Sequence, residues 1–277
     1  MGSFRVDRMF LGWLALAVAQ SVAGLIVHVK APAVPYGLEW MLVTDLIIVA
    51  VVAFLAFRSD WTGWKLAAAL VVIPFATSFV DMVEGTVFLT QLGIGWRSLL
   101  IQLCLTYAIV LPLWQFTFAR RPATARPNSP GADRSAFSRL WRFVVSDISY
   151  LLLYFIAGMI IFPFVRDFYA TQTLPSYPKL VSLQLLVRGP VFVLVCIVMT
   201  RMFGMRRWSG ALVVGLAFTL VSGVAPLVQP NPYFPDAVRW VHFGEVVSSN
   251  FVFGMVVALL WGKSRQAVAP QAIAQSA

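Results

Sequence analysis

Six ionisable residues lie inside long apolar stretches of the sequence, where charged side chains are rare. They are Asp45, Asp81, Glu84, Arg188, His242 and Glu245. A charge at the centre of a membrane-spanning helix raises the free energy by about 3 kcal/mol or more unless it is paired or hydrated. Carboxylates, an imidazole and a guanidinium in such surroundings can exchange protons, bind ions or small solutes, or hold a metal ion. We therefore treat these six residues as candidates for a binding or coupling site.

The spacing of four candidates places them as pairs on two helices. Side chains three or four positions apart share one face of an α-helix. Asp81 and Glu84 meet this condition, and so do His242 and Glu245. We expect both pairs to face the interior of the protein, where they would line a hydrated vestibule that opens toward the periplasm.

Asp45 and Arg188 have opposite charges and equal predicted depths. Asp45 precedes Arg58 by thirteen residues, and Arg188 precedes Arg201 by the same number. With a helical rise of about 1.5 Å per residue, both lie about 20 Å from the cytoplasmic ends of their helices. This equivalence suggests that the two side chains form an ion pair, and it places them in the same periplasmic third as the other candidates.

The charges of the six candidates do not balance. Four of them are carboxylates: Asp45, Asp81, Glu84 and Glu245. Arg188 is the only candidate that is always cationic. In a low-dielectric site the three unmatched carboxylates must take up protons, bind a cation, pair with His28 or His242, or stay hydrated. A dry site of this composition would handle protons or cations.

The first of three functional hypotheses is a transporter or permease for a small solute or ion. Arg188 is followed by Gly189 and Pro190, which could break the helix and hold an anionic group beside the guanidinium. One of the carboxylates would exchange protons during the transport cycle. All six candidates would then be substrate-binding or coupling residues.

The second hypothesis is an intramembrane metal-dependent enzyme that acts at the outer leaflet. Its zinc or iron ligands would come from His28, Asp81, Glu84, His242 and Glu245. A metal-bound water could then attack a lipid or a peptide. The chain has no His-Glu-x-x-His or Gly-x-Ser-x-Gly motif, and a transition metal is the one cofactor that it suggests.

The third hypothesis is a non-catalytic assembly factor or sensor. In that case the polar cluster only fixes the register of packed helices, and the protein works through a partner. Its soluble handles are short loops and the arginine-rich segment RRPATARPNSPGADRS.

The elements that must position these residues are eight apolar segments. Residues of the hydrophobic types make up 60% of the chain and charged residues 12%, whereas about a quarter of the residues in a soluble domain are charged. A helix of about 20 apolar residues crosses the hydrocarbon core of a bilayer, and these segments are too long for the strands of a barrel. The predicted spans are 9–29, 40–57, 65–89, 98–118, 140–165, 180–203, 209–228 and 238–260. We predict an all-α, multi-pass membrane bundle with lipid as its solvent.

The distribution of lysine and arginine predicts the orientation in the membrane. The two chain ends and every second loop hold fifteen of them, whereas the alternate loops hold five. Because cytoplasmic loops are enriched in positive charge, we expect an inner-membrane protein with both termini in the cytoplasm. This topology explains the net charge of +10 without a nucleic-acid partner.

The segments divide into two groups of four. Residues 1–118 form a first half, 119–139 a flexible cytoplasmic linker rich in Pro and Arg, 140–265 a second half and 266–277 a disordered tail. Short matches at offsets near 140 residues, such as Arg58 with Arg201 and Trp64 with Trp208, suggest an internal repeat. Repeats with an even number of helices run in the same direction across the membrane.

Overall fold

The chain folds into a bundle of long helices. The computed structural model describes residues 6–28, 34–88, 96–119, 135–203, 207–230 and 234–262. In this part of the chain, eight helices are long and apolar enough to cross a membrane, so the predicted eight-helix fold is confirmed. The helical segments are α1 (Val6–Val27), α2 (Gly37–Arg58), α3 (Gly63–Phe88), α4 (Trp96–Trp114), α5 (Ala136–Tyr169), α6 (Tyr177–Leu183), α7 (Gly189–Met202), α8 (Arg207–Thr219), α9 (Ala225–Val228) and α10 (Asp236–Trp261). α6 and α7 together form one span, and so do α8 and α9.

The outer surface of the bundle is apolar, as a lipid-facing surface must be. Large hydrophobic side chains stand exposed along the helices, among them Leu25, Ile160, Phe164, Leu186 and Leu216. Helices suit this environment because each satisfies its own backbone hydrogen bonds where no water is present. The protein is therefore a multi-pass membrane protein.

The boundaries agree with the predicted spans to within a few residues, with one difference at the linker. α5 begins at Ala136, inside the range predicted as linker, because Ser135 caps it by accepting a hydrogen bond from the backbone N–H of Ser138 at 3.2 Å. The remainder of the predicted linker (120–134) and the predicted tail lie outside the described residues.

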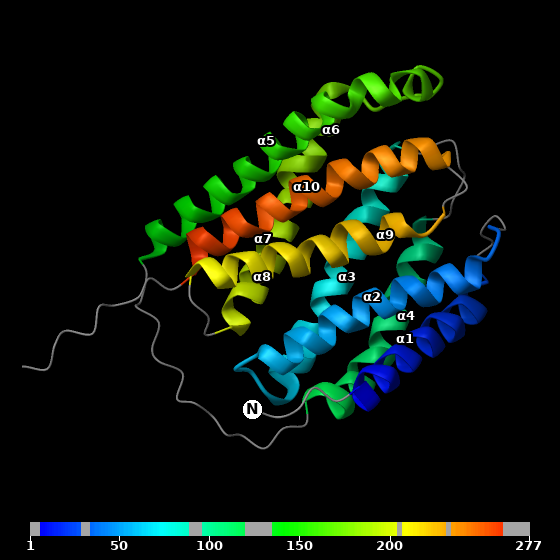
Figure 1. Ribbon diagram of the computed structural model, residues 1–277, viewed down its shortest axis with the longest axis vertical. Coiled ribbons are helices and arrows are strands. Elements are labelled where there is room, and N and C mark those ends of the chain that lie inside the picture. Colours follow the sequence, from blue (N-terminus) through cyan, green and yellow to red (C-terminus); the bar gives the residue numbers. More distant parts are fainter. Residues whose placement is uncertain are drawn as a thin grey trace, which may run out of the picture.

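The two groups of four spans pack in the same pattern. In the first half (α1–α4), α1 packs against α4 and α4 against α3; in the second half (α5–α10), α5 packs against α10 and α10 against α8. The halves meet where α3 contacts α7 and where α2 contacts α9. Figure 1 shows the blue-to-teal first half on one side and the green-to-orange second half on the other. The second span of each half thus meets the third span of the other, as two-fold-related repeats would.

Two of the spans contain a widened helical turn just before a proline. The turn Gln184–Arg188 joins α6 to α7, and Leu220–Val224 joins α8 to α9; both have π-helical geometry. In each case a proline, Pro190 or Pro226, stands two positions after the end of the turn. Proline has no N–H to donate, and the wider turn takes up the resulting break in the hydrogen-bond pattern. Both breaks lie at the depth of the cavity described below.

Two glycines allow the backbones of α8 and α10 to come into close contact. A Cβ atom on Gly254 would lie 2.8 Å from the Cα of Gly215, and one on Gly215 would lie 2.8 Å from the backbone oxygen of Phe251. Small residues allow this close approach, which is a main source of helix association in lipid.

The variant Gly254→Val is expected to destabilise the protein, because the added methyl groups have no room between α8 and α10. Overpacking of this kind typically reduces the free energy of unfolding by about 1–3 kcal/mol. The measurement is unfolding in mixed micelles, followed by circular dichroism. Gly244→Val is the matched control, since a Cβ on Gly244 of the same helix meets no atom within 4 Å. Equal unfolding midpoints for the two variants would contradict this packing.

Candidate functional site

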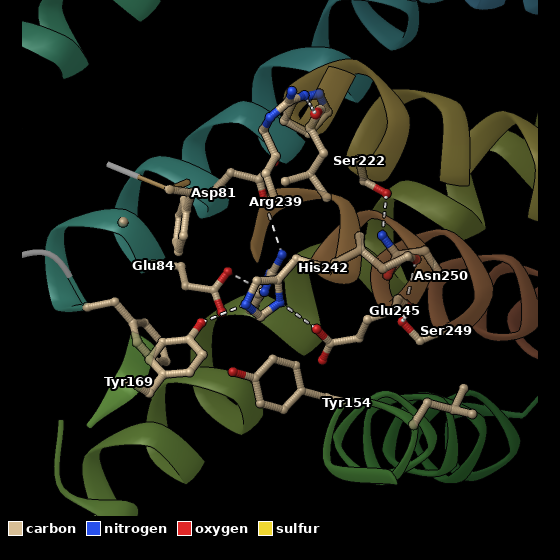
Figure 2. Close-up of a pocket in the computed structure, with 18 of the residues that line it drawn as sticks. Asp81, Glu84, Tyr154, Tyr169, Ser222, Arg239, His242, Glu245, Ser249 and Asn250 are labelled. Carbon is tan, nitrogen blue, oxygen red and sulfur yellow. Dashed lines mark hydrogen bonds and ion pairs between the residues drawn. The ribbon is translucent and has the colours of Figure 1, made fainter. Parts of the chain in front are cut away.

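A cavity of about 290 Å³ lies inside the bundle where the two halves meet. α3 of the first half lines it with Asp81, Glu84, Gly85 and Phe88, and the second half lines it from α5, α9, α10 and both widened turns. Residues of the links before α6 and before α10 also line it, so the cavity lies toward the ends of the bundle whose loops hold few lysines and arginines. Figure 2 shows its polar side chains.

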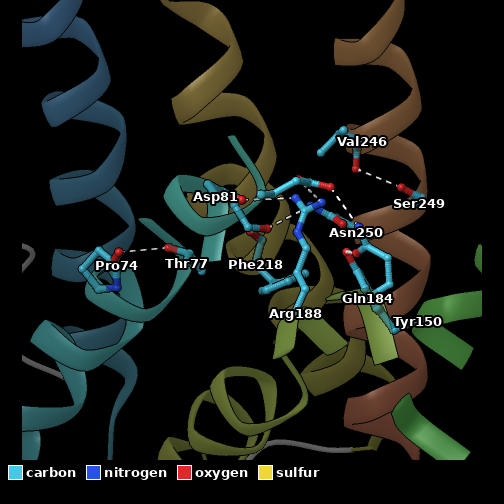
Figure 3. A network of polar contacts seen from close by, with 12 residues as sticks. Pro74, Thr77, Asp81, Tyr150, Gln184, Arg188, Phe218, Val246, Ser249 and Asn250 are labelled. Carbon is cyan, nitrogen blue, oxygen red and sulfur yellow. Dashed lines mark hydrogen bonds and ion pairs between the residues drawn. The ribbon is translucent and has the colours of Figure 1, made fainter. Parts of the chain in front are cut away.

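Arg188 joins the two halves by an ion pair with two carboxylates. It extends from the turn Gln184–Arg188, is only 7% exposed, and its Nη2 lies 3.1 Å from Oδ1 of Asp81. Its Nη1 contacts the carboxylate of Glu84. Figure 3 shows the guanidinium directed toward Asp81, with its stem beside the turn. The guanidinium also lies over the ring of Phe192, 5.1 Å from its centroid.

Two neutral side chains hold Glu84 in this arrangement. Nε2 of Gln184 donates a hydrogen bond to Oε1 of Glu84 at 3.0 Å. The hydroxyl of Tyr150 donates in turn to Oε1 of Gln184 at 3.1 Å. Gln184 and Tyr150 are both buried. The network therefore connects α3, α5 and the widened turn, and it fixes the position of the carboxylate.

A second chain of hydrogen bonds joins α5 to α10 on the other side of the cavity. Nδ1 of His242 lies 2.6 Å from Oε2 of Glu245, and Nε2 lies 2.7 Å from the hydroxyl of Tyr169 (Figure 2). Because a carboxylate only accepts hydrogen bonds, the proton of the first bond belongs to Nδ1, an assignment that follows from the partner. The order Tyr169–His242–Glu245 can relay a proton along the cavity wall.

Arg239 has a structural role at the edge of the cavity, where it binds the end of α9. Its Nη1 donates to the backbone oxygens of Leu227 and Val228, at 2.9 and 3.0 Å, at the end of α9. Its Nη2 donates to Asp236 at 2.9 Å. The guanidinium thus satisfies carbonyls that the helix end leaves without partners.

Five of the six predicted site residues line this cavity, and Asp45 does not. The five are Asp81, Glu84, Arg188, His242 and Glu245. Asp45 is fully buried between α1 and α2, where Nε2 of Gln20 donates to its Oδ1 at 2.9 Å. The predicted ion pair of Asp45 with Arg188 is therefore wrong. Equal depth along two helices does not define the directions in which their side chains point.

The five residues proposed as metal ligands do not form one ligand set. Within the described residues, no three side chains of His, Cys, Asp or Glu are placed to hold a metal ion. Asp81 and Glu84 bind Arg188, while His242 and Glu245 bind each other. His28 is exposed, and its Nδ1 lies 3.1 Å from the backbone oxygen of Ile26.

Several residues of the site were not among the predicted ones, and Arg239 and Tyr169 are two of them. Arg239 precedes His242 by three positions and so shares its helix face, a signal that the sequence does contain. Tyr169 stands at the end of α5 and meets His242 only through the packing of distant segments, so no local spacing could have indicated it. No family model, curated protein or solved structure matches the chain. The geometry of the cavity is therefore the basis on which a function can be assigned.

The hydrogen bond to Glu245 predicts that the imidazole of His242 carries a proton on Nδ1. Because the chain has only two histidines, histidine labelled with nitrogen-15 in a His28→Gln background gives the signals of this ring alone. We expect a protonated Nδ1 at neutral pH, and a shifted Nε2 resonance in Tyr169→Phe, which removes a hydroxyl partner. Tyr154→Phe is the control, because no hydrogen bond joins Tyr154 to this ring in the described structure. A ring protonated on Nε2 alone would contradict the arrangement.

Proposed function

We propose that the protein is a transporter or permease for a small solute or ion, coupled to protons or cations. The observation that carries this proposal is an acidic cavity within a membrane bundle, at the contact between its two halves. Transporters built from two repeats bind their substrates at that place, with ionisable residues facing the interior.

The charge of the cavity supports coupling to protons or cations. Its carboxylates are Asp81, Glu84 and Glu245. Arg188 neutralises one charge of this group, and Arg239 is paired with Asp236. The excess negative charge must be compensated by a proton on a carboxyl or on His242, or by a bound cation. Release of that proton or cation to the opposite side is the coupling step that this composition allows.

The helix breaks supply the second part of the proposal, which is movement. Arg188 lies in one widened turn, and Ser222 lies in the other; both residues line the cavity. Wide turns and prolines interrupt the regular hydrogen bonds of a helix, so bending there disrupts less structure than bending elsewhere. Opening and closing of the cavity would occur at these two turns.

The orientation of the site follows from the charge asymmetry of the loops. The cavity opens toward the helix ends whose loops hold five lysines and arginines in the sequence against fifteen on the other side. By the positive-inside rule those ends face the periplasm of an inner-membrane protein. The solute would enter the cavity from that side.

Filling the cavity without changing its charge should block transport. Gly85 lines the cavity, and a Cβ on it meets no atom within 4 Å, so Gly85→Leu places an isobutyl group in the open space. The measurement uses vesicles that contain the purified protein and a pH-sensitive dye, to which amines, amino acids, sugars and carboxylates are added outside. We expect at least one class to change the internal pH, and Gly85→Leu to slow that change by about tenfold or more.

The matched control is Gly244→Leu, which adds the same side chain on the exposed side of α10. It should leave the rate unchanged. Proton coupling is contradicted if no solute class moves protons, and the role of the cavity is contradicted if Gly85→Leu is as active as the control.

A further inference from the structure

We propose that the ligand of the cavity is a small organic cation, an ammonium group on an apolar body, with Glu245 as its carboxylate partner. This inference rests on the proposed function in one respect, which is that the same cavity binds a ligand. The evidence for it is which polar groups of the cavity already have hydrogen-bond or ion-pair partners and which do not.

The two arginines of the cavity leave no free cation for an anionic ligand. Arg188 is bound to Asp81 and Glu84. Its Nε has no acceptor, but this atom is buried. Arg239 is bound to Asp236 and to the backbone at the end of α9. From the sequence we expected Arg188 to hold an anionic group of the ligand. The ion pairs of both arginines favour a cationic ligand in its place.

Glu245 is the one carboxylate of the cavity without an arginine partner. Its Oε2 is bound to His242, whereas its Oε1 receives no hydrogen bond from the described residues. Oε1 faces α5 at Gly158, where a Cβ would lie 3.6 Å away, so the glycine leaves this oxygen uncrowded. The side chain is only 10% exposed. A carboxylate desolvated to this degree binds a cation more strongly than one in water.

Aromatic rings surround the open space beside this carboxylate. Six of them line the cavity: Phe88, Tyr150, Tyr154, Phe168, Tyr169 and Phe234. Tyr154 lies one helical turn before Gly158 and so on the same side as Oε1 of Glu245. Aromatic faces attract ammonium groups through their quadrupoles, and they also pack against a hydrocarbon body. Several aromatic side chains around one carboxylate favour an organic cation over a hydrated metal ion.

The size of the cavity limits the ligand. Its volume of about 290 Å³ lies just below the range of roughly 300–1,000 Å³ found for small-molecule sites. A monoamine, a short diamine or a choline-sized quaternary ammonium compound fits this space. A long peptide or an intact phospholipid does not.

The test compares amines with neutral and anionic molecules of the same shape. Isothermal titration of the purified protein in nanodiscs uses 2-phenylethylamine, butylamine, 1,4-diaminobutane and choline, together with 2-phenylethanol and phenylacetate. We expect at least one amine to bind, and phenylethanol and phenylacetate to bind about tenfold more weakly than the tightest amine, or not at all. Glu245→Gln should weaken amine binding by about tenfold or more, because it removes the charge and keeps the shape.

Two further variants separate binding from folding. Tyr154→Leu keeps every charge and should also weaken the amine, since it removes an aromatic face. Asp45→Asn removes a carboxylate that is buried outside the cavity, and it should leave amine affinity unchanged. The inference is overturned if no amine binds, if phenylacetate binds as tightly as the amines, or if Glu245→Gln and Asp45→Asn behave alike.

These outcomes are distinct from those of the transport test. Amine binding without movement of any solute into vesicles would contradict the proposed transport and leave the ligand class standing. Movement of an anionic or neutral solute that Gly85→Leu blocks, in the absence of amine binding, would overturn the ligand class alone.

Discussion

A guanidinium group cannot remain unpaired inside an apolar bundle, and this constraint determines how the two halves of the protein meet. Arg188 satisfies it with Asp81 and Glu84, which lie on the third span of the other half. Removing one partner of a buried pair typically lowers stability by about 3–5 kcal/mol, because the remaining charge stays in a low-dielectric site. The contact between α3 and α7 is therefore specified by charge as well as by apolar packing.

The same pair shapes the chemistry of the cavity. Because Arg188 engages two carboxylates, the groups that the cavity leaves for the proposed ligand are Glu245, the chain Tyr169–His242–Glu245 and the aromatic rings of the wall. The wide turn at Gln184–Arg188 carries both the arginine and the glutamine that holds Glu84. Any bending at that turn moves the ion pair and the cavity wall together, and this links the charge state of the site to the relative position of the halves.

The sequence was sufficient for the part of the fold that the bilayer imposes. The eight spans follow from length and hydropathy, and helical spacing correctly placed Asp81 beside Glu84 and His242 beside Glu245. Spacing gives the position of a residue along its helix, but its direction depends on packing, so Asp45 was assigned to Arg188 although it faces Gln20. The contacts of Tyr169 with His242 and of Arg239 with the end of α9 depend on how distant segments pack, which one sequence does not contain.

The most direct test of the account is a double-mutant cycle on the free energy of unfolding for Arg188→Gln and Glu84→Gln. Residues in contact couple by about 0.5–3 kcal/mol, whereas distant residues give additive effects. We predict coupling of about 1 kcal/mol or more for this pair, and additivity for Arg188→Gln with Asp45→Asn. Additive effects of Arg188→Gln and Glu84→Gln would contradict the ion pair between the two halves and, with it, the placement of the cavity.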